Sequence, residues 1–256
     1  MPVLTATGSR WWRLWKGSPL ASRDASFHER GIVGALFAPL KLAFGGLLVL
    51  LALILAAWII DWIFVFKVWP SGLERLQSLL EQDLARATQL WDSYSEFPRF
   101  ATATANFFYA MLFKLTGIHD MSARFAEGAA LSIPDTIVRN TYIANFEAIQ
   151  VAMVATQLFG IRLAILLMTA PLLLLVCLVA LTDGLVQRAV RRASGGRESA
   201  SLYHRAKHLQ VALMAIGLLI GLLWPATIDV RWIGVPLTAF LGILTRLQWA
   251  YYKKHL

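Results

Sequence analysis

The sequence is poor in the residues that build disulfide-bonded or highly charged soluble proteins. It has one cysteine, Cys177, among 256 residues, so no disulfide can form within the chain. Charged residues make up 15% of the chain, whereas about a quarter of an ordinary soluble domain is charged. Hydrophobic residues make up 58%, and this balance favours a membrane protein over a soluble one.

The sequence also lacks the motifs that mark common catalytic and metal-binding sites. It contains no GxxxxGK[ST] phosphate loop, no GxSxG elbow and no HExxH pair. His204 and His208 have the spacing of metal ligands, but their basic surroundings favour histidines at a membrane interface. We therefore expect neither an enzyme nor a cofactor.

Long apolar runs are abundant. Residues 42–60, 163–182 and 209–228 are each nineteen or twenty residues long without a charge, and a bilayer core needs about 20 residues of helix. A fourth run, 232–245, can be extended past Arg246, whose side chain can reach the membrane surface. The sequence predicts an all-α polytopic membrane protein with about four transmembrane helices, at 42–66, 148–182 (including an outer extension), 209–228 and 232–251.

The distribution of basic residues predicts the direction of the spans. Residues 1–41 and the loop 183–208 each carry six Lys or Arg against two acids, and the tail 252–256 adds two more cations. Residues 67–147 carry seven Lys or Arg against nine acids. Because short cytoplasmic loops are enriched in Lys and Arg, we expect a bacterial inner-membrane protein with both termini and the 183–208 loop in the cytoplasm. Residues 67–147 would then be periplasmic.

The 67–147 segment is expected to be helical. Leu, Ala and Trp recur at steps of three and four from Leu73 to Trp91, which predicts an amphipathic helix. Ser71 and Glu74 have the spacing of a capping box at its start. A second helix is expected over 99–117, and a third begins near Pro134 and can run unbroken into the second span.

The N-terminal arm, residues 1–41, interleaves tryptophans with cations. Rings of this kind settle in the headgroup layer, and the charges are attracted to anionic lipid. Contact with nucleic acid is an alternative for the same composition, but a membrane-tethered arm favours lipid. The residues expected to form this membrane-surface arm are Trp11, Trp12, Arg13, Trp15 and Lys16.

Two residue pairs are expected to hold helices together. Asp61 follows the first apolar run and Arg162 precedes the second, so both would lie near the outer membrane boundary and could form an ion pair. Gly217 and Gly221 form a GxxxG motif in the third run, which allows close helix packing. The sequence leaves open whether that packing is within the chain or between chains.

The basic loop carries a resemblance to a known family. Its features are Asp183-Gly184, the cluster Arg188, Arg191 and Arg192, then Gly196-Arg197-Glu198, and Tyr203-His204 leading to Lys207. This pattern resembles the integrating conjugative element membrane proteins, a family of unknown biochemical function. The resemblance implies a part in conjugative DNA transfer, beside the coupling ATPase of a type IV secretion system in a Gram-negative bacterium. It implies no catalytic residues.

The residues of the loop suggest how it could act. Residues 183–192 can form a short amphipathic helix with arginines on one side, ended by the glycines that follow. The resulting basic hairpin could dock an acidic patch of the ATPase or lie along anionic lipid. The residues expected to make this contact are Arg188, Arg191, Arg192, Arg197, Tyr203, His204 and Lys207. We expect a non-catalytic scaffold or adaptor, with a channel or transporter subunit as the alternative; self-association is left open, and direct nucleic-acid contact is not expected.

Overall fold

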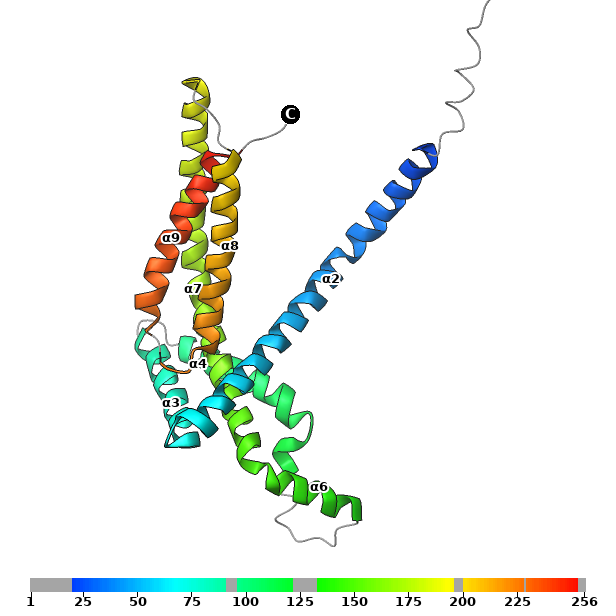
Figure 1. The fold of residues 1–256 in the computed structure, drawn as a ribbon, viewed down its shortest axis with the longest axis vertical. Helices are drawn as coiled ribbons and strands as arrows, with labels where there is room; N and C mark the ends of the chain where they lie inside the picture. Colours follow the sequence, from blue (N-terminus) through cyan, green and yellow to red (C-terminus); the bar gives the residue numbers. More distant parts are fainter. Residues whose placement is uncertain (1–19, 91–95, 122–132, 196–199, 228, 253–256) are drawn as a thin grey trace, which may run out of the picture. The chain divides into compact units, whose positions relative to one another are not determined.

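The computed structural model is helical throughout the residues it describes, which are 20–90, 96–121, 133–195, 200–227 and 229–252 (Figure 1). In these ranges four helices are long and apolar enough to cross a membrane: Ala38–Val68, Phe146–Ala193, Ser201–Leu223 and Trp232–Ala250. The predicted fold class is therefore confirmed, and the chain is a multi-pass membrane protein. It divides into two compact units, Met1–Ala52 and Leu53–Leu256.

The first span belongs to helix α2, Leu20–Ile63, which continues as the short π-helix η1, Phe64–Val68. The last turns of α2 lie in the second unit, where Ile54 and Ala57 are buried. Trp58 donates a hydrogen bond from Nε1 to Oγ1 of Thr156 at 2.9 Å. This contact joins the end of α2 to the long helix α7.

Helices α7 (Phe146–Ala193), α8 (Ala200–Leu223) and α9 (Val230–Ala250) run side by side in the second unit (Figure 1). Glycines on α8 bring them together. A Cβ atom at Gly217 would lie 2.5 Å from Leu237 of α9, and one at Gly221 would lie 3.2 Å from Leu166 of α7. Both glycines of the GxxxG motif thus pack within the chain.

A polar contact crosses the middle of this bundle. Gln210 of α8 donates to Oγ1 of Thr245 on α9 at 3.2 Å, and that hydroxyl lies 3.7 Å from Sγ of Cys177 on α7. Thr245 also donates to the carbonyl of Leu241 in its own helix. The three residues therefore lie at one level of the bundle.

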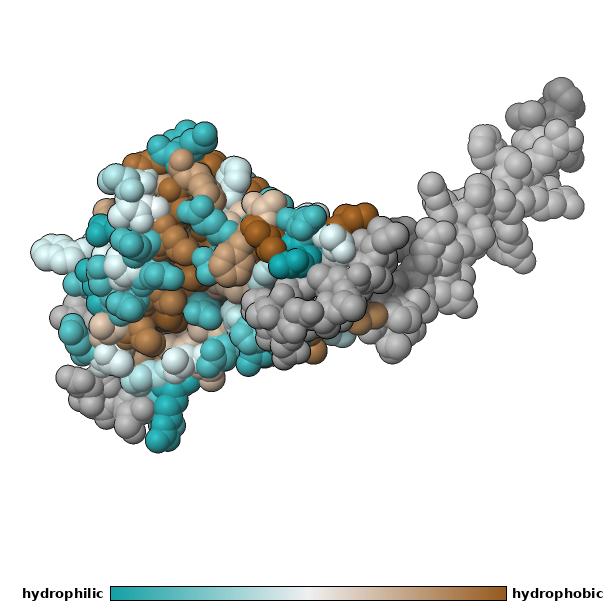
Figure 2. Space-filling model, turned by 90° about the horizontal axis from the view of Figure 1, so that it is seen from below, coloured by the Kyte–Doolittle hydropathy of each residue, from teal (hydrophilic) through white to brown (hydrophobic). Residues whose placement is uncertain are grey.

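Amphipathic helices pack against the first half of α7: α3 (Gly72–Leu90), α4 (Glu96–Tyr109) with the π-helix η2 (Ala110–Lys114), and α6 (Ile133–Ala144). On α3 the predicted apolar stripe is confirmed, since Leu76 and Ala87 are fully buried. Trp91, at its end, lies outside the described residues. Small side chains let α4 approach α7, where a Cβ at Gly160 would lie 2.6 Å from Cα of Ala105. Figure 2 shows many hydrophilic residues on this end, with apolar residues between them.

Two predicted helix boundaries differ from the structure. The third outer helix does not run unbroken into the second span, because α6 ends at Ala144 and Asn145 has a non-helical backbone. The Asn145 side chain donates to the carbonyl of Thr141 at 2.9 Å, an interaction that competes with helix continuation. Residues 183–192 do not form a separate short helix either. They continue α7 to Ala193, and the turn follows at Gly195 with φ of 68°.

Candidate functional site: two arginine-capped ends of the bundle

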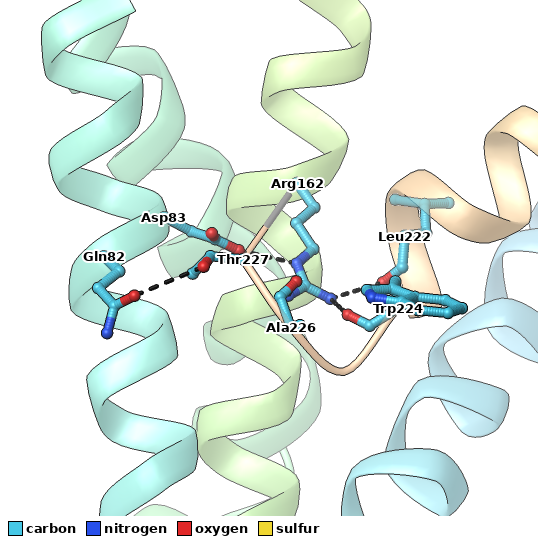
Figure 3. A network of polar contacts seen from close by, with 7 residues as sticks. All are labelled: Gln82, Asp83, Arg162, Leu222, Trp224, Ala226 and Thr227. Atoms are coloured by element: carbon cyan, nitrogen blue, oxygen red, sulfur yellow. Dashed lines mark hydrogen bonds and ion pairs between the residues drawn. The ribbon is translucent and has the colours of Figure 1, made fainter. Parts of the chain in front are cut away.

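Arg162, on α7, is the centre of a polar network at one end of the bundle (Figure 3). Its Nε donates to Oδ2 of Asp83 on α3 at 2.9 Å. Its Nη1 donates to the carbonyls of Trp224 at 2.7 Å and Leu222 at 3.4 Å, and its Nη2 donates to the carbonyl of Ala226 at 3.3 Å. Because Arg162 is only 7% exposed, its charge needs these partners. We call this group the Arg162 cluster.

The Arg162 cluster caps the C-terminal end of α8. The last carbonyls of a helix have no partner within the helix and carry a partial negative charge. Here α8 ends at Leu223 because Pro225 disfavours helical backbone at the residue before it. The guanidinium of Arg162 then supplies the missing donors. A further hydrogen bond, from Thr227 Oγ1 to Gln82 Oε1 at 3.5 Å, joins this turn to α3.

The ion pair predicted between Asp61 and Arg162 forms instead between Asp83 and Arg162. Asp61 is 4% exposed and interacts with Arg162 through space, but no hydrogen bond joins it to any other described residue. Span lengths indicated the depth of Arg162 but not the approach of α3. Burial raises the pKa of the Asp83 carboxyl, and the charge of Arg162 opposes that rise.

A second polar group lies at the other end of the bundle, where α7 passes the end of α9. Asp183 forms an ion pair with Arg246 of α9, and both side chains are about half exposed. A Cβ at the next residue, Gly184, would lie 2.7 Å from the carbonyl oxygen of Arg246. The Asp183-Gly184 pair therefore combines a charge contact with close backbone packing.

Two arginines of α7 cover the C-terminal end of α9. Arg191 donates from Nη1 to the carbonyl of Ala250 at 3.0 Å, and its guanidinium carbon lies 3.8 Å from the ring centre of Tyr251. Arg188 lies over the ring of Tyr252 at 5.2 Å. Cations at this position complement the helix dipole and attract the aromatic ring. We call these residues, with Asp183 and Arg246, the Asp183 cluster.

The structure divides the residues that the sequence grouped as one contact surface. Arg188 and Arg191 face α9, and Tyr203 joins them through an edge contact with Tyr252 at 5.6 Å. Three others are exposed to the surroundings: Arg192, His204 and Lys207. Arg197 and the arm residues Trp11, Trp12, Arg13, Trp15 and Lys16 lie outside the described residues. The tyrosine pair after α9 was missed as a partner, although its place just beyond the fourth span was a usable signal.

The exposed face of α7 beyond Asp183 is apolar. Leu185, Val186 and Val190 are 39%, 60% and 62% exposed, whereas Arg188 and Arg191 on the opposite side are half-buried. The predicted amphipathic periodicity is therefore present, but its basic side is turned inward. The reason is that arginine side chains here have aromatic and carbonyl partners on α9.

The two clusters are separated by the thickness of a membrane. Asp183 follows Arg162 by twenty-one residues in one continuous helix, which corresponds to about 32 Å of helix rise. The hydrocarbon core of a bilayer is about 30 Å thick. The clusters thus mark the two edges of the apolar bundle. Among the described residues no group of three His, Cys, Asp or Glu could hold a metal ion.

The comparisons with known proteins support a role in conjugation. The family model for DtrJ-like proteins, described as IncC plasmid conjugative DNA transfer proteins, matches residues 68–253, a range that contains both clusters. No curated protein and no solved structure matches the chain. The resemblance to integrating conjugative element membrane proteins pointed to the same process under a different family. A match over this much of a four-span helical chain shows that the protein belongs to the DtrJ-like family of conjugative DNA transfer proteins.

Proposed function

We propose that the protein is a non-catalytic inner-membrane scaffold or adaptor that docks the coupling ATPase of a type IV secretion system. The docking surface is the exposed apolar face of α7 beyond the Asp183 cluster, formed by Leu185, Val186 and Val190. We call it the α7 docking face. The uncovered position of this face, at the end of the bundle with the basic residues, is the observation that carries the proposal.

The depth of the α7 docking face favours a protein partner. Val190 follows Asp183 by seven residues, which is about 10 Å of helix, and the headgroup layer adds only about 5–7 Å to the hydrocarbon core. The end of the face therefore extends past the lipid. An exposed apolar helix face in water is a typical partner surface, and a groove on the partner could accept it.

The proposed orientation follows from the distribution of charge. Residues 183–208 carry six Lys or Arg against two acids, so the α7 docking face would lie in the cytoplasm, where an ATPase has access to nucleotide. Both termini would also be cytoplasmic, and the α3–α6 segment periplasmic. Arg192, exposed beside the face, would give it a basic rim for an acidic partner.

Co-purification tests the docking proposal. The full chain is solubilised from cells that also contain the coupling ATPase, and the ATPase recovered with wild type is compared with that recovered with Val186→Glu/Val190→Glu. We expect loss of most of the ATPase, because two carboxylates would enter an apolar contact. The matched control is Leu115→Glu, which changes an equally exposed apolar residue on the opposite side of the membrane. Equal recovery with all three proteins would remove the proposal.

A channel or transporter subunit is the second candidate. The hydrogen bond between Gln210 and Thr245 places polar groups between apolar spans, as a conduction path would require. Ion flux into proteoliposomes containing the purified chain tests this candidate. Flux that disappears in Gln210→Leu would favour the channel over the scaffold.

A further inference from the structure

The start of α8 carries a set of exposed basic residues. His204, Arg205, Lys207 and His208 are all exposed, while Ala206 between them is buried. With 100° of rotation for each residue, the four side chains occupy the half of the helix that points away from Ala206. We call them the basic face of α8.

The basic face of α8 has no acidic partner within its own helix. Residues 200–227 contain no Asp or Glu. The hydrogen bonds and ion pairs found among the described residues include none to Arg205, Lys207 or His208. This differs from the neighbouring α7, where Arg188 and Arg191 contact the end of α9. The positive charge available at this end of the bundle is therefore on α8.

The depth of the basic face can be read from the contact across the bundle. Gln210 lies level with Cys177, since both contact the hydroxyl of Thr245. Cys177 is six residues, or about 9 Å, deeper in the bundle than Asp183, and Lys207 is three residues, or about 4.5 Å, shallower than Gln210. Lys207 thus lies about 4–5 Å on the membrane side of the Asp183 cluster.

That depth selects the binding partner. A cation at the edge of the hydrocarbon core extends its long side chain to the headgroup layer, where it meets phosphate groups. A soluble protein or a nucleic acid does not reach below the headgroups, whereas phospholipids surround an exposed side chain there. We propose that the basic face of α8 is a binding site for the phosphate groups of acidic phospholipids. This site does not depend on the docking of an ATPase.

Lipid binding to the purified full chain tests the proposal. Detergent-solubilised protein is titrated with phosphatidylglycerol or with phosphatidylcholine, and bound lipid is counted by native mass spectrometry. We expect preference for phosphatidylglycerol, and about 30-fold weaker binding in Arg205→Gln/Lys207→Gln, since each cation near the surface contributes about fivefold. Arg99→Gln/Lys114→Gln, which removes two exposed cations from the opposite end, is the matched control and should bind as wild type.

Further arms separate the alternatives. Arg205→Lys/Lys207→Arg keeps both charges and should retain the preference, and all variants should unfold at similar temperatures because the changed side chains are exposed. Equal binding of the two lipids, or unchanged binding by Arg205→Gln/Lys207→Gln, would overturn the proposal. Inorganic phosphate or a single-stranded oligonucleotide that displaces phosphatidylglycerol at equal concentration would also overturn it, by assigning the face to a soluble anion.

Discussion

The two ends of the bundle use the same device in different surroundings. At one end Arg162 donates to the last carbonyls of α8, and at the other Arg191 donates to the last residue of α9. Arg162 is almost fully buried and has a carboxylate partner on a third helix. Arg191 is half-buried and lies against a tyrosine ring.

The difference shows what burial adds to a helix cap. A half-exposed cation at a helix end gains a small electrostatic stabilisation that water screens. A buried cation gains more from its partners but leaves them with a large desolvation cost when it is removed. The Arg162 cluster should therefore hold the helices together, whereas the Asp183 cluster should adjust their ends.

The largest expected effect is that of Arg162→Met. The change removes the charge and leaves Asp83 buried without its partner, so we expect a loss of about 3–5 kcal/mol in the free energy of unfolding. Denaturant unfolding in detergent measures it. Arg99→Met, which breaks the exposed pair with Glu96, is the control and should cost less than about 1 kcal/mol. Similar losses in the two variants would contradict the comparison.

The next effect separates the two buried acids beside Arg162. Asp83→Asn loses a charge-assisted hydrogen bond and should destabilise the protein by about 2–3 kcal/mol. Asp61→Asn removes a buried carboxyl without breaking a hydrogen bond and should change stability by less than about 1 kcal/mol. The reverse order, measured by the same unfolding assay, would make Asp61 the main partner.

A smaller effect is expected at the other end from Gly184→Ala. The added methyl group would meet the backbone of α9 at Arg246, so we expect a loss of about 1–3 kcal/mol. Gly221→Ala is the matched comparison, because its methyl group meets the tip of Leu166, which can move. Thermal unfolding of both variants measures the difference. A Gly221 variant that unfolds at the lower temperature would show that the backbone contact at Gly184 is not close.

The smallest effect is expected for Arg191→Gln, at about 1 kcal/mol, from loss of the dipole interaction and the ring contact. Lys207→Gln, on the basic face of α8, is the control and should leave stability unchanged in lipid-free detergent. The effect of Arg191→Gln should weaken at high salt, since the site is half-exposed. A loss as large as that of Arg162→Met would remove the distinction between the two ends.

The sequence predicted the spans because uninterrupted apolar runs of membrane length have few other structures available. It also placed Arg162 near a boundary, since the residue directly precedes such a run. It did not identify Asp83 as the partner, because that contact depends on how α3 packs against α7. Periodicity likewise predicted an apolar and a basic side for residues 183–192. It could not show that Tyr251 and Tyr252 would turn the basic side inward.

Labelling of single cysteines tests most directly whether the two clusters lie at opposite membrane surfaces. In a Cys177→Ser background, Glu81→Cys on α3 and Ser194→Cys after α7 each introduce one exposed thiol. A membrane-impermeant maleimide added to cells with a permeabilised outer membrane should label the Glu81→Cys protein. The Ser194→Cys protein should react only after the inner membrane is opened. Labelling of both thiols from the same side of a sealed inner membrane would contradict a bundle that spans the bilayer between the Arg162 and Asp183 clusters.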